Sequence, residues 1–274
     1  MSTRTWHRVA LDVPNGPPQL VLASGEHVGQ ALAEAQHSVT GSRPLAVDPA
    51  TSDEIPLGES VGKGHVVRLG EAPPLLAFDW PLGVLPAITG NPSGAHVEPG
   101  WAEHPEAGLY VVEAQVVRDQ LVDVFLGILE RVPAADNLEV RVLDHFEQAG
   151  QTDIWLTSRI NARKILRFLD DQEDELIHNG FIELSIYLRA QKATLRLTEH
   201  KTVVWLAEDR AMQPDVERWL RELHVPRIEK VVTVETGPHV HYRLAKSKAR
   251  KQLSDELFRQ RLRRVDSLKT AAPG

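Results

Sequence analysis

The stretch that decides the fold is Phe181–Leu244, FIELSIYLRAQKATLRLTEHKTVVWLAEDRAMQPDVERWLRELHVPRIEKVVTVETGPHVHYRL. Apolar and polar side chains alternate over residues 181–189 and again over 194–198, and a run rich in β-branched residues follows at 202–206. Because successive side chains of a strand point to opposite faces, this pattern predicts three strands, each with a buried and a solvent-facing side. The short connections favour antiparallel neighbours.

The apolar spacing then changes to that of a helix. Pro214 suits a first helical turn, where its missing N–H is not needed. Val225-Pro226 predicts the end of the helix, because a residue before proline avoids the α region. Two strands at 230–235 and 239–244 are predicted to close as a hairpin around a Thr-Gly-Pro turn. One apolar stripe marks the buried side of the helix, formed by Val216, Trp219, Leu220 and Leu223.

Strands and helices in this order predict an α+β protein with an antiparallel or mixed sheet and helices on one face. Residues 109–158 show the strand, helix, strand, strand order of ferredoxin-like βαββ elements, and a long helix is predicted at 161–179. We therefore expect an α+β core domain over residues 109–244. Residues 1–108 hold 13 of the 18 prolines and 13 of the 18 glycines, which predicts a Pro/Gly-rich, mostly β or irregular region. Residues 245–274 predict a basic helical tail.

The composition excludes several kinds of site. Cysteine is absent, so the chain has no disulfide, no thiolate nucleophile, no iron–sulfur cluster and no cysteine-ligated zinc. No apolar run approaches the ~18 residues of a membrane span, and no apolar leader follows Met1. We expect a cytoplasmic protein, and the high arginine, alanine, leucine and valine content is typical of a bacterial one.

No segment carries a specific catalytic motif. Gly58–Gly64, GESVGKG, resembles a phosphate-binding loop, but it is one residue short of the required spacing and has glycine in place of the Mg²⁺-binding hydroxyl. Ser93 does not lie in a G-x-S-x-G nucleophile elbow. We therefore lean against an enzyme, and no cofactor is expected unless the histidines bind a metal.

The histidines offer the candidate metal site. His239 and His241 are two residues apart in a predicted strand, so their side chains share a face and can chelate one ion. His200 and His145, each next to a carboxylate in the sequence, are the further candidate ligands. The alternative is that these are half-exposed residues without a metal, because histidine pairs at this spacing are common and the spacing fixes no third ligand.

Charge is unevenly distributed along the chain. The net charge is −7, and the segment from Arg243 to Arg264 holds nine basic and two acidic residues. That segment therefore carries +7 and residues 1–242 carry −14, since Asp266 and Lys269 cancel. Five carboxylates crowd the C-terminal end of the long helix, where the helix dipole disfavours them: Asp170, Asp171, Glu173, Asp174 and Glu175.

These charges suggest two kinds of contact. The five carboxylates are predicted to bind a basic partner, with a solvated helix face or the chain's own tail as alternatives. Phosphate binding is one interpretation of the tail arginines, but the acidic body repels nucleic acid and no aromatic residue lies between them for base stacking. Docking of the tail on an acidic surface is at least as well supported. The arginines concerned are Arg259, Arg261, Arg263 and Arg264.

Together these patterns favour binding over catalysis. The leading hypothesis is an intracellular bacterial protein-binding protein, an adaptor or immunity-type protein, whose acidic surface attracts a basic protein. The first alternative is a metal-dependent hydrolase with its site at His239 and His241. The second is a nucleic-acid-associated regulator acting through the basic tail. Self-association through the C-terminal helix is a further prediction, and no membrane partner is expected.

Overall fold

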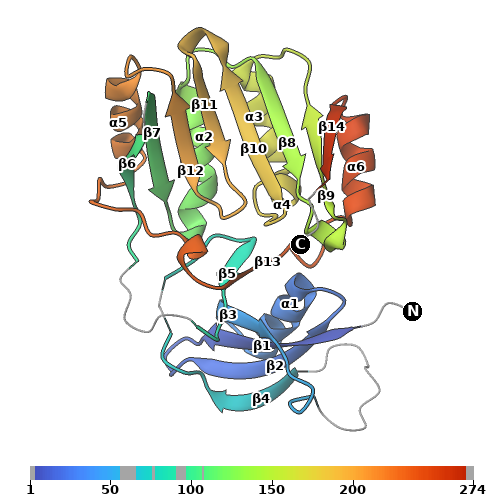
Figure 1. Cartoon of the computed structure of the whole chain (residues 1–274). Helices are drawn as coiled ribbons and strands as arrows, with labels where there is room; N and C mark the ends of the chain where they lie inside the picture. The colour runs from blue at the N-terminus through green and yellow to red at the C-terminus, as the bar shows by residue number, and fades with distance from the viewer. Residues whose placement is uncertain (1–3, 56–65, 76–77, 91–96, 107, 270–274) are drawn as a thin grey trace.

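Two larger antiparallel sheets with helices on their apolar faces make the chain an α+β protein, as the sequence predicts (Figure 1). The computed structural model describes residues 4–55, 66–75, 78–90, 97–106 and 108–269. The Gly58–Gly64 segment and Ser93 lie outside these ranges. Within them, no helix combines the length and the apolar character that crossing a bilayer requires.

The smaller sheet has four strands in the order β3-β1-β2-β4. Buried Val9 and Leu11 of the central strand pack with Ala31 and Leu32 of the one helix inserted between its second and third strands. That helix therefore covers one face of the sheet. The elements are β1 (Thr5–Asp12), β2 (Gln19–Gly25), α1 (Val28–Ser38), β3 (Arg43–Pro49) and β4 (Val66–Glu71).

The larger sheet has eight strands in the order β14-β9-β8-β10-β11-β12-β7-β6, and each neighbouring pair is antiparallel. Its strands are β6 (Gly100–Glu106), β7 (Leu109–Gln115), β8 (Asn137–Val142), β9 (Gln151–Leu156), β10 (Ile182–Leu188), β11 (Ala193–Leu197), β12 (Val203–Ala207) and β14 (Arg263–Lys269). The meander β10-β11-β12 confirms the three strands predicted from residue 181 to 206. The βαββ order predicted over 109–158 is present, but three strands separate β7 from β8, and the ferredoxin-like grouping stays a prediction.

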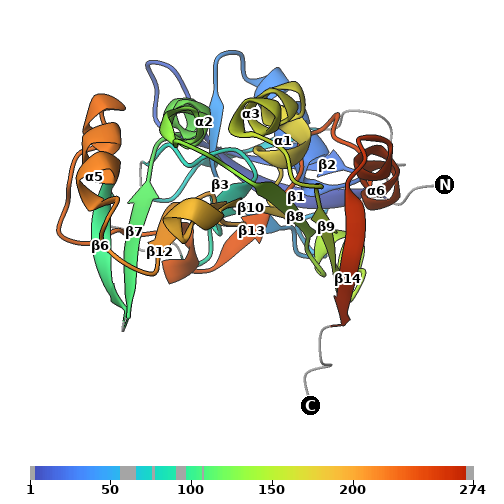
Figure 2. The ribbon, with the colours of Figure 1, turned by 90° about the horizontal axis from the view of Figure 1, so that it is seen from above.

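Helices cover one face of the larger sheet. Leu138, Val140 and Ile186 on that face are fully buried and share one apolar cluster with the helices. Figures 1 and 2 show α2, α3 and α4 against the middle of the sheet and α5 and α6 near its two ends. The predicted helix after residue 213 is present with its apolar stripe buried. The helices are α2 (Leu121–Arg131), α3 (Ala162–Asp171), α4 (Glu173–Leu176), α5 (Gln213–Glu222) and α6 (Arg250–Arg259).

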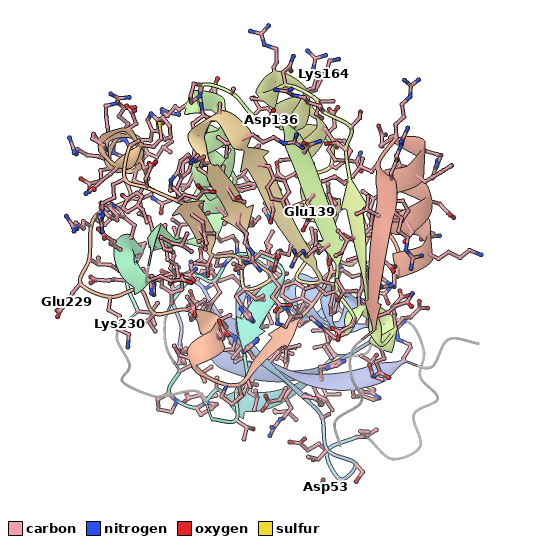
Figure 3. All side chains as sticks on the ribbon, turned by 45° about the horizontal axis from the view of Figure 1, so that its top comes forward. Asp53, Asp136, Glu139, Lys164, Glu229 and Lys230 are labelled. Carbon is pink, nitrogen blue, oxygen red and sulfur yellow. The ribbon has the colours of Figure 1, made fainter. Side chains whose placement is uncertain are left out.

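The opposite face of the larger sheet carries a ladder of ion pairs. Arg141 Nε lies 2.6 Å from Glu139 Oε1, and Arg196 Nη2 lies 2.5 Å from Glu183 Oε2. Tyr187 Oη donates to Glu139 Oε2 at 2.7 Å. Figure 3 labels Glu139 on β8 in the middle of the sheet. Among the described residues no helix covers this face (Figure 2), but the solvent-facing side predicted for β10 is wrong in part. Glu183 and Ser185 are buried there, because neighbouring side chains of the sheet, including the ion-paired arginines, cover them.

The hairpin predicted over residues 230–244 is wrong. Residues 226–228 bridge instead to Trp101 of β6, whose N–H donates to Pro226 O at 2.9 Å and whose carbonyl accepts from Ile228 N at 2.9 Å. The chain continues irregularly to a short 3₁₀ helix, η4 (Val234–Thr236). β13 (His239–His241) then pairs with β5 (Val84–Pro86). Alternation indicates a strand but not its partner, and here the partner comes from a distant part of the chain.

The C-terminal segment is helical only in its first part. α6 is the predicted basic helix and buries Leu253 and Leu257. Buried Arg250 anchors its start, because the guanidinium donates to Gln151 O at 2.7 Å and to Asp153 Oδ2 at 3.0 Å. The chain then turns and forms β14 antiparallel to β9 instead of extending the helix. The edge of the sheet offers unpaired backbone groups, which a strand satisfies and a helix does not.

Candidate metal centre

Four histidines from three segments meet beside β13. His239 and His241 begin and end that strand, His200 lies in the turn between β11 and β12, and His145 follows β8. The ring centroids of His239 and His200 are 4.8 Å apart, and those of His241 and His145 are 4.9 Å apart. The structure thus brings together all four histidines that the sequence suggested as ligands, while metal binding itself stays a prediction.

Their donor atoms form two overlapping sets. One set is His200, His239 and His241, and the other is His145, Glu199 and His241; in each set the donor atoms lie within 4.8 Å of one another. Glu199 bridges the sets, because its carboxylate oxygens lie 3.7 Å from His145 Nε2 and 3.9 Å from His200 Nε2. Bonds from zinc to histidine nitrogen measure ~2.0–2.1 Å. Modest side-chain movements would therefore bring three nitrogens onto one ion.

Two of the imidazoles are oriented by backbone carbonyls. His241 Nδ1 lies 2.7 Å from Gly180 O, and His239 Nδ1 lies 2.8 Å from Gly237 O. A ring nitrogen that faces a carbonyl carries the proton, so Nε2 keeps the lone pair. Both residues of β13 therefore present Nε2 as the metal-binding atom.

Carboxylates lie beside Nδ1 of the other two imidazoles, and one of them forms a hydrogen bond. His145 Nδ1 lies 3.2 Å from Asp144 Oδ1, and His200 Nδ1 lies 3.4 Å from Glu235 Oε2. Histidine ligands of metals almost always donate their second ring N–H to a carboxylate or a carbonyl. Three of the four histidines thus have a hydrogen-bond partner at Nδ1, and His200 Nδ1 has a carboxylate at ion-pair distance.

Close backbone packing fixes β13 against the larger sheet. Gly180 N donates to Tyr242 O at 3.0 Å, and Tyr242 N donates to Gly83 O at 2.8 Å. A Cβ atom on Gly180 would lie 1.9 Å from Gly83 O, so only glycine fits at this position. The same contact places the carbonyl of Gly180 under His241.

The turn between β11 and β12 presents Glu199 and His200. Thr198 N donates to Thr202 O at 3.0 Å, and Lys201 N donates to Thr198 O at 3.0 Å, which closes a tight turn. Lys201 is fully buried beneath it and donates from Nζ to Asn179 O at 2.6 Å. This hydrogen bond ties the turn to the segment that also carries Gly180.

Burial keeps key imidazoles neutral. It lowers the pKa of His241 to about 3, with the neighbouring imidazoles acting in the same direction, and it lowers the pKa of His200 below its ordinary value. Neutral imidazole is the form that binds metals, so both side chains are competent at pH 7. Burial also raises the pKa of Glu199, although His145 opposes this shift. A carboxylate with a raised pKa accepts a proton more readily.

A cavity of about 490 Å³ opens beside the cluster. His145, His241 and Phe181 line one side, and His7 of β1 and His27, which precedes α1, line the other. A ligand in this cavity would touch two of the four histidines. The cluster is therefore accessible as well as partly buried.

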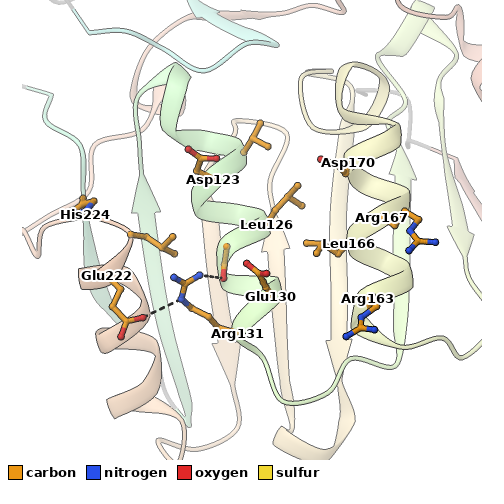
Figure 4. A pocket seen from close by; sticks show the side chains of 13 residues that line it. Asp123, Leu126, Glu130, Arg131, Arg163, Leu166, Arg167, Asp170, Glu222 and His224 are labelled. Carbon is orange, nitrogen blue, oxygen red and sulfur yellow. Dashed lines mark hydrogen bonds and ion pairs between the residues drawn. The ribbon is translucent and has the colours of Figure 1, made fainter.

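A cavity of greater volume lies elsewhere, on the helical face. It measures about 670 Å³ and lies between α2, α3 and α5 (Figure 4). Its side chains form ion pairs and apolar contacts: Arg131 Nε lies 3.3 Å from Glu222 Oε2, and Leu126 and Leu166 project between the helices. Over the described ranges its wall holds no group of metal ligands. The histidine cluster is the better candidate because it brings potential metal ligands together, although this cavity has the greater volume.

The predicted acidic surface surrounds the junction of α3 and α4. Together with Lys248 it lines a shallow cavity of about 430 Å³. Glu175 is engaged by the chain itself, since it accepts from Lys248 N at 3.0 Å and from Lys248 Nζ at 3.3 Å. Glu173 lies 2.8 Å from His178 Nε2. The three most exposed members are Asp170, Asp171 and Asp174.

The tail arginines are divided between α6 and β14. Arg259 Nη2 lies 3.0 Å from Glu256 Oε2 on the same helix, and Arg264 Nη2 lies 2.5 Å from buried Asp153 Oδ1. Arg261 follows the helix with φ 66°, and Arg263 begins β14. Two of the four predicted phosphate-binding residues thus have acidic partners within the chain.

Sequence reasoning missed the groups that surround the histidine cluster. Lys201 is a lysine in a polar turn, a position that normally predicts exposure, and it is fully buried. His7 and His27 lie on the cavity wall, but nothing in their sequence neighbourhoods connects them with His241. Arg243 also lies there, two residues beyond His241, and was not singled out from the other basic residues. The pairing of β13 with β5 and the packing of α1 on Arg243 bring the N-terminal elements to the site.

Comparisons of the chain with protein-family models, with curated proteins and with solved structures each found no match.

Proposed function

We propose that the protein is a metal-dependent hydrolase whose divalent ion, zinc in the first instance, binds at His200, His239 and His241. The observation that carries this proposal is the oxygen atom beside Nδ1 of every histidine in the cluster, hydrogen-bonded in His145, His239 and His241, which leaves the Nε2 atoms as donors. Structural zinc sites are closed by four protein ligands, whereas catalytic sites have three and keep one position for water. The three-histidine set fits the catalytic kind.

Glu199 is the proposed general base. It borders the three-histidine set on the side of His145, within 3.9 Å of His200 Nε2. Zinc lowers the pKa of its bound water to ~7. With such an ion held by His200, His239 and His241, Glu199 would accept a proton from the activated water and would return it to the leaving group as the bond between that group and the carbonyl carbon or phosphorus breaks. The neighbouring cavity provides the space for that substrate.

Metal analysis tests the site. The full-length chain is freed of metal with a chelator, exposed to zinc and dialysed, and its metal content is measured by mass spectrometry. One equivalent is expected in the wild type, and His239→Ala and His241→Ala should lose it. His104→Ala is the matched control, because His104 lies on β6 with its own partner Glu113 at 2.5 Å. Zinc binding far below one equivalent in the wild type would overturn the site.

Hydrolysis of activated carboxylic esters and phosphodiesters tests the activity. Glu199→Gln should keep its zinc and slow hydrolysis about 100-fold or more, the usual contribution of a general base. Loss of zinc from this variant would make Glu199 a ligand, which contradicts its role as the base. If the metal-loaded wild type hydrolyses none of these substrates, the metal site stands but the proposed hydrolase activity is refuted.

A second candidate function is the binding of a basic protein by a cytoplasmic bacterial adaptor or immunity-type protein. Five carboxylates around the α3–α4 junction, with Lys248 as the cation in their cavity, support it. A basic protein that binds the chain is first identified by cross-linking. The double variant Asp170→Lys/Asp174→Lys should associate with that protein more slowly than the wild type, and the difference should shrink as the salt concentration rises. Glu229→Lys, an exposed reversal on the loop after α5 (Figure 3), is the control. Equal association rates in both variants would contradict this function.

A further inference from the structure

The cavity beside the histidine cluster has a second wall that the proposed function does not use. Arg243 lies two residues beyond His241, and both line the cavity. Tyr242 between them is buried in the apolar cluster of the smaller sheet. In extended chain, side chains two residues apart point to the same side. The metal ligand and the arginine therefore face one space.

Arg243 supplies a positive charge on the wall of this cavity. Its side chain is 16% exposed, and its Nη1 donates to Ser247 O. Its Nη2 lies 3.8 Å from Glu147 Oε1, which is too long for a hydrogen bond. Burial lowers the pKa of Arg243, yet arginine stays charged at physiological pH. Among the described residues, the contact to Ser247 uses one of the five N–H donors of this guanidinium.

We infer that Arg243 binds an anionic oxygen group of the substrate, a carboxylate or a phosphate, while the bond to be cleaved lies at the metal. The inference rests on the proposed function of the histidine cluster. A guanidinium presents a planar fork of donors that matches two oxygens of such a group. Residues two apart in a strand are separated by ~6.6 Å along the chain. Because Arg243 and His241 line one cavity of about 490 Å³, the charged group and the cleaved bond must fit together within it, which indicates a small acidic ester, amide or phosphoester.

Two carboxylates act against this binding. Glu147 and Glu26 also line the cavity. Glu147 is partly satisfied, because its Oε1 accepts from Arg250 N at 3.3 Å. The anion therefore binds against repulsion from Glu147, and removal of that charge should strengthen binding. The bound metal ion compensates, so anion binding should be weaker in the metal-free protein.

Calorimetry with inorganic phosphate and with acetate tests the inference on protein of measured zinc content. Arg243→Gln should weaken phosphate binding about 10- to 100-fold, as the loss of charge-assisted hydrogen bonds does. Arg243→Lys should retain part of it, and Glu147→Gln should bind several-fold more tightly. Arg167→Gln, an exposed arginine on α3, is the control and should bind as the wild type does. The ligand that depends more strongly on Arg243 identifies the anion.

The outcomes separate the two proposals. If the wild type binds no zinc, the proposed metal-dependent function is refuted, whatever the anion measurements show. If zinc content is normal and Arg243→Gln binds phosphate and acetate as tightly as the wild type, the inference is overturned and the metal site stands. If Arg243→Gln does not fold, unchanged affinities in both Arg243→Lys and Glu147→Gln overturn it equally.

Discussion

Two glycines each orient one candidate ligand through a carbonyl oxygen, but the space around the two glycines differs. Gly180 and Gly237 both offer a carbonyl oxygen to a histidine Nδ1, at 2.7 Å for His241 and 2.8 Å for His239. A Cβ atom on Gly180 would meet the backbone of Gly83 at 1.9 Å, whereas on Gly237 it would meet nothing within 4 Å. A backbone atom cannot rotate away as a side chain can. Packing therefore requires glycine at position 180 but not at position 237.

Gly180→Ala should lower both the stability of the protein and its affinity for zinc. Overpacking of a close contact costs about 1–3 kcal/mol, and the displaced carbonyl no longer orients His241. Gly237→Ala should change neither property, because the carbonyl remains and space is free. Urea unfolding and zinc titration of both variants measure this. Equal behaviour of the two variants would contradict the role of Gly180.

At the residue scale, the sequence indicated the candidate ligands but not the residues that surround them. The i, i+2 spacing placed His239 and His241 on one face, and neighbouring carboxylates suggested His200 and His145. Spacing is a local property, so it could not show that four Nδ1 atoms find separate oxygen partners. Arg243 was placed in the predicted strand 239–244 and counted in the basic charge of residues 243–264, although its side chain is largely buried. Charge counts do not distinguish a cavity wall from a solvated surface.

Elements with local partners were predictable and elements with distant partners were not. β10, β11 and β12 follow one another and pair with one another, so alternation and short turns were sufficient. β13 pairs with β5, and β14 fills the edge beside β9. Both pairings join segments far apart in sequence. Hydrophobic periodicity carries no information on which distant edge is free, and helix propensity in the tail was overridden by the hydrogen bonds available at that edge.

The candidate site lies where the two sheets of the molecule meet. Val234 and Tyr242 from the C-terminal half share an apolar cluster with Val9 of the smaller sheet and Leu32 of α1. The first turn of α1 touches the same segment, because a Cβ atom on Gly29 would lie 1.8 Å from the carbonyl oxygen of Arg243. The segment after β13 is thus packed from both sides. A change of charge or packing at this contact should therefore change the stability of the whole protein.

His27 at the N-terminus of α1 is the group through which pH acts on that contact. Both of its ring nitrogens are buried, and neither has a hydrogen-bond partner among the described residues. Burial first, and then Arg243 and His7, lower the pKa of His27 to about 4 from 6.5. The unfolded chain therefore binds a proton at His27 between pH 6.5 and 4 that the folded protein does not. Stability falls as pH decreases through this range.

His27→Leu should remove that part of the acid sensitivity. Between pH 7 and pH 5 the wild type should lose about 1 kcal/mol more unfolding free energy than the variant, a figure reduced for the partial exposure of the side chain. Urea unfolding of both proteins at the two pH values measures the difference. The other titrating groups are common to both proteins, so the comparison isolates His27. If both proteins lose the same free energy, the buried imidazole is not what makes the contact between the sheets sensitive to acid.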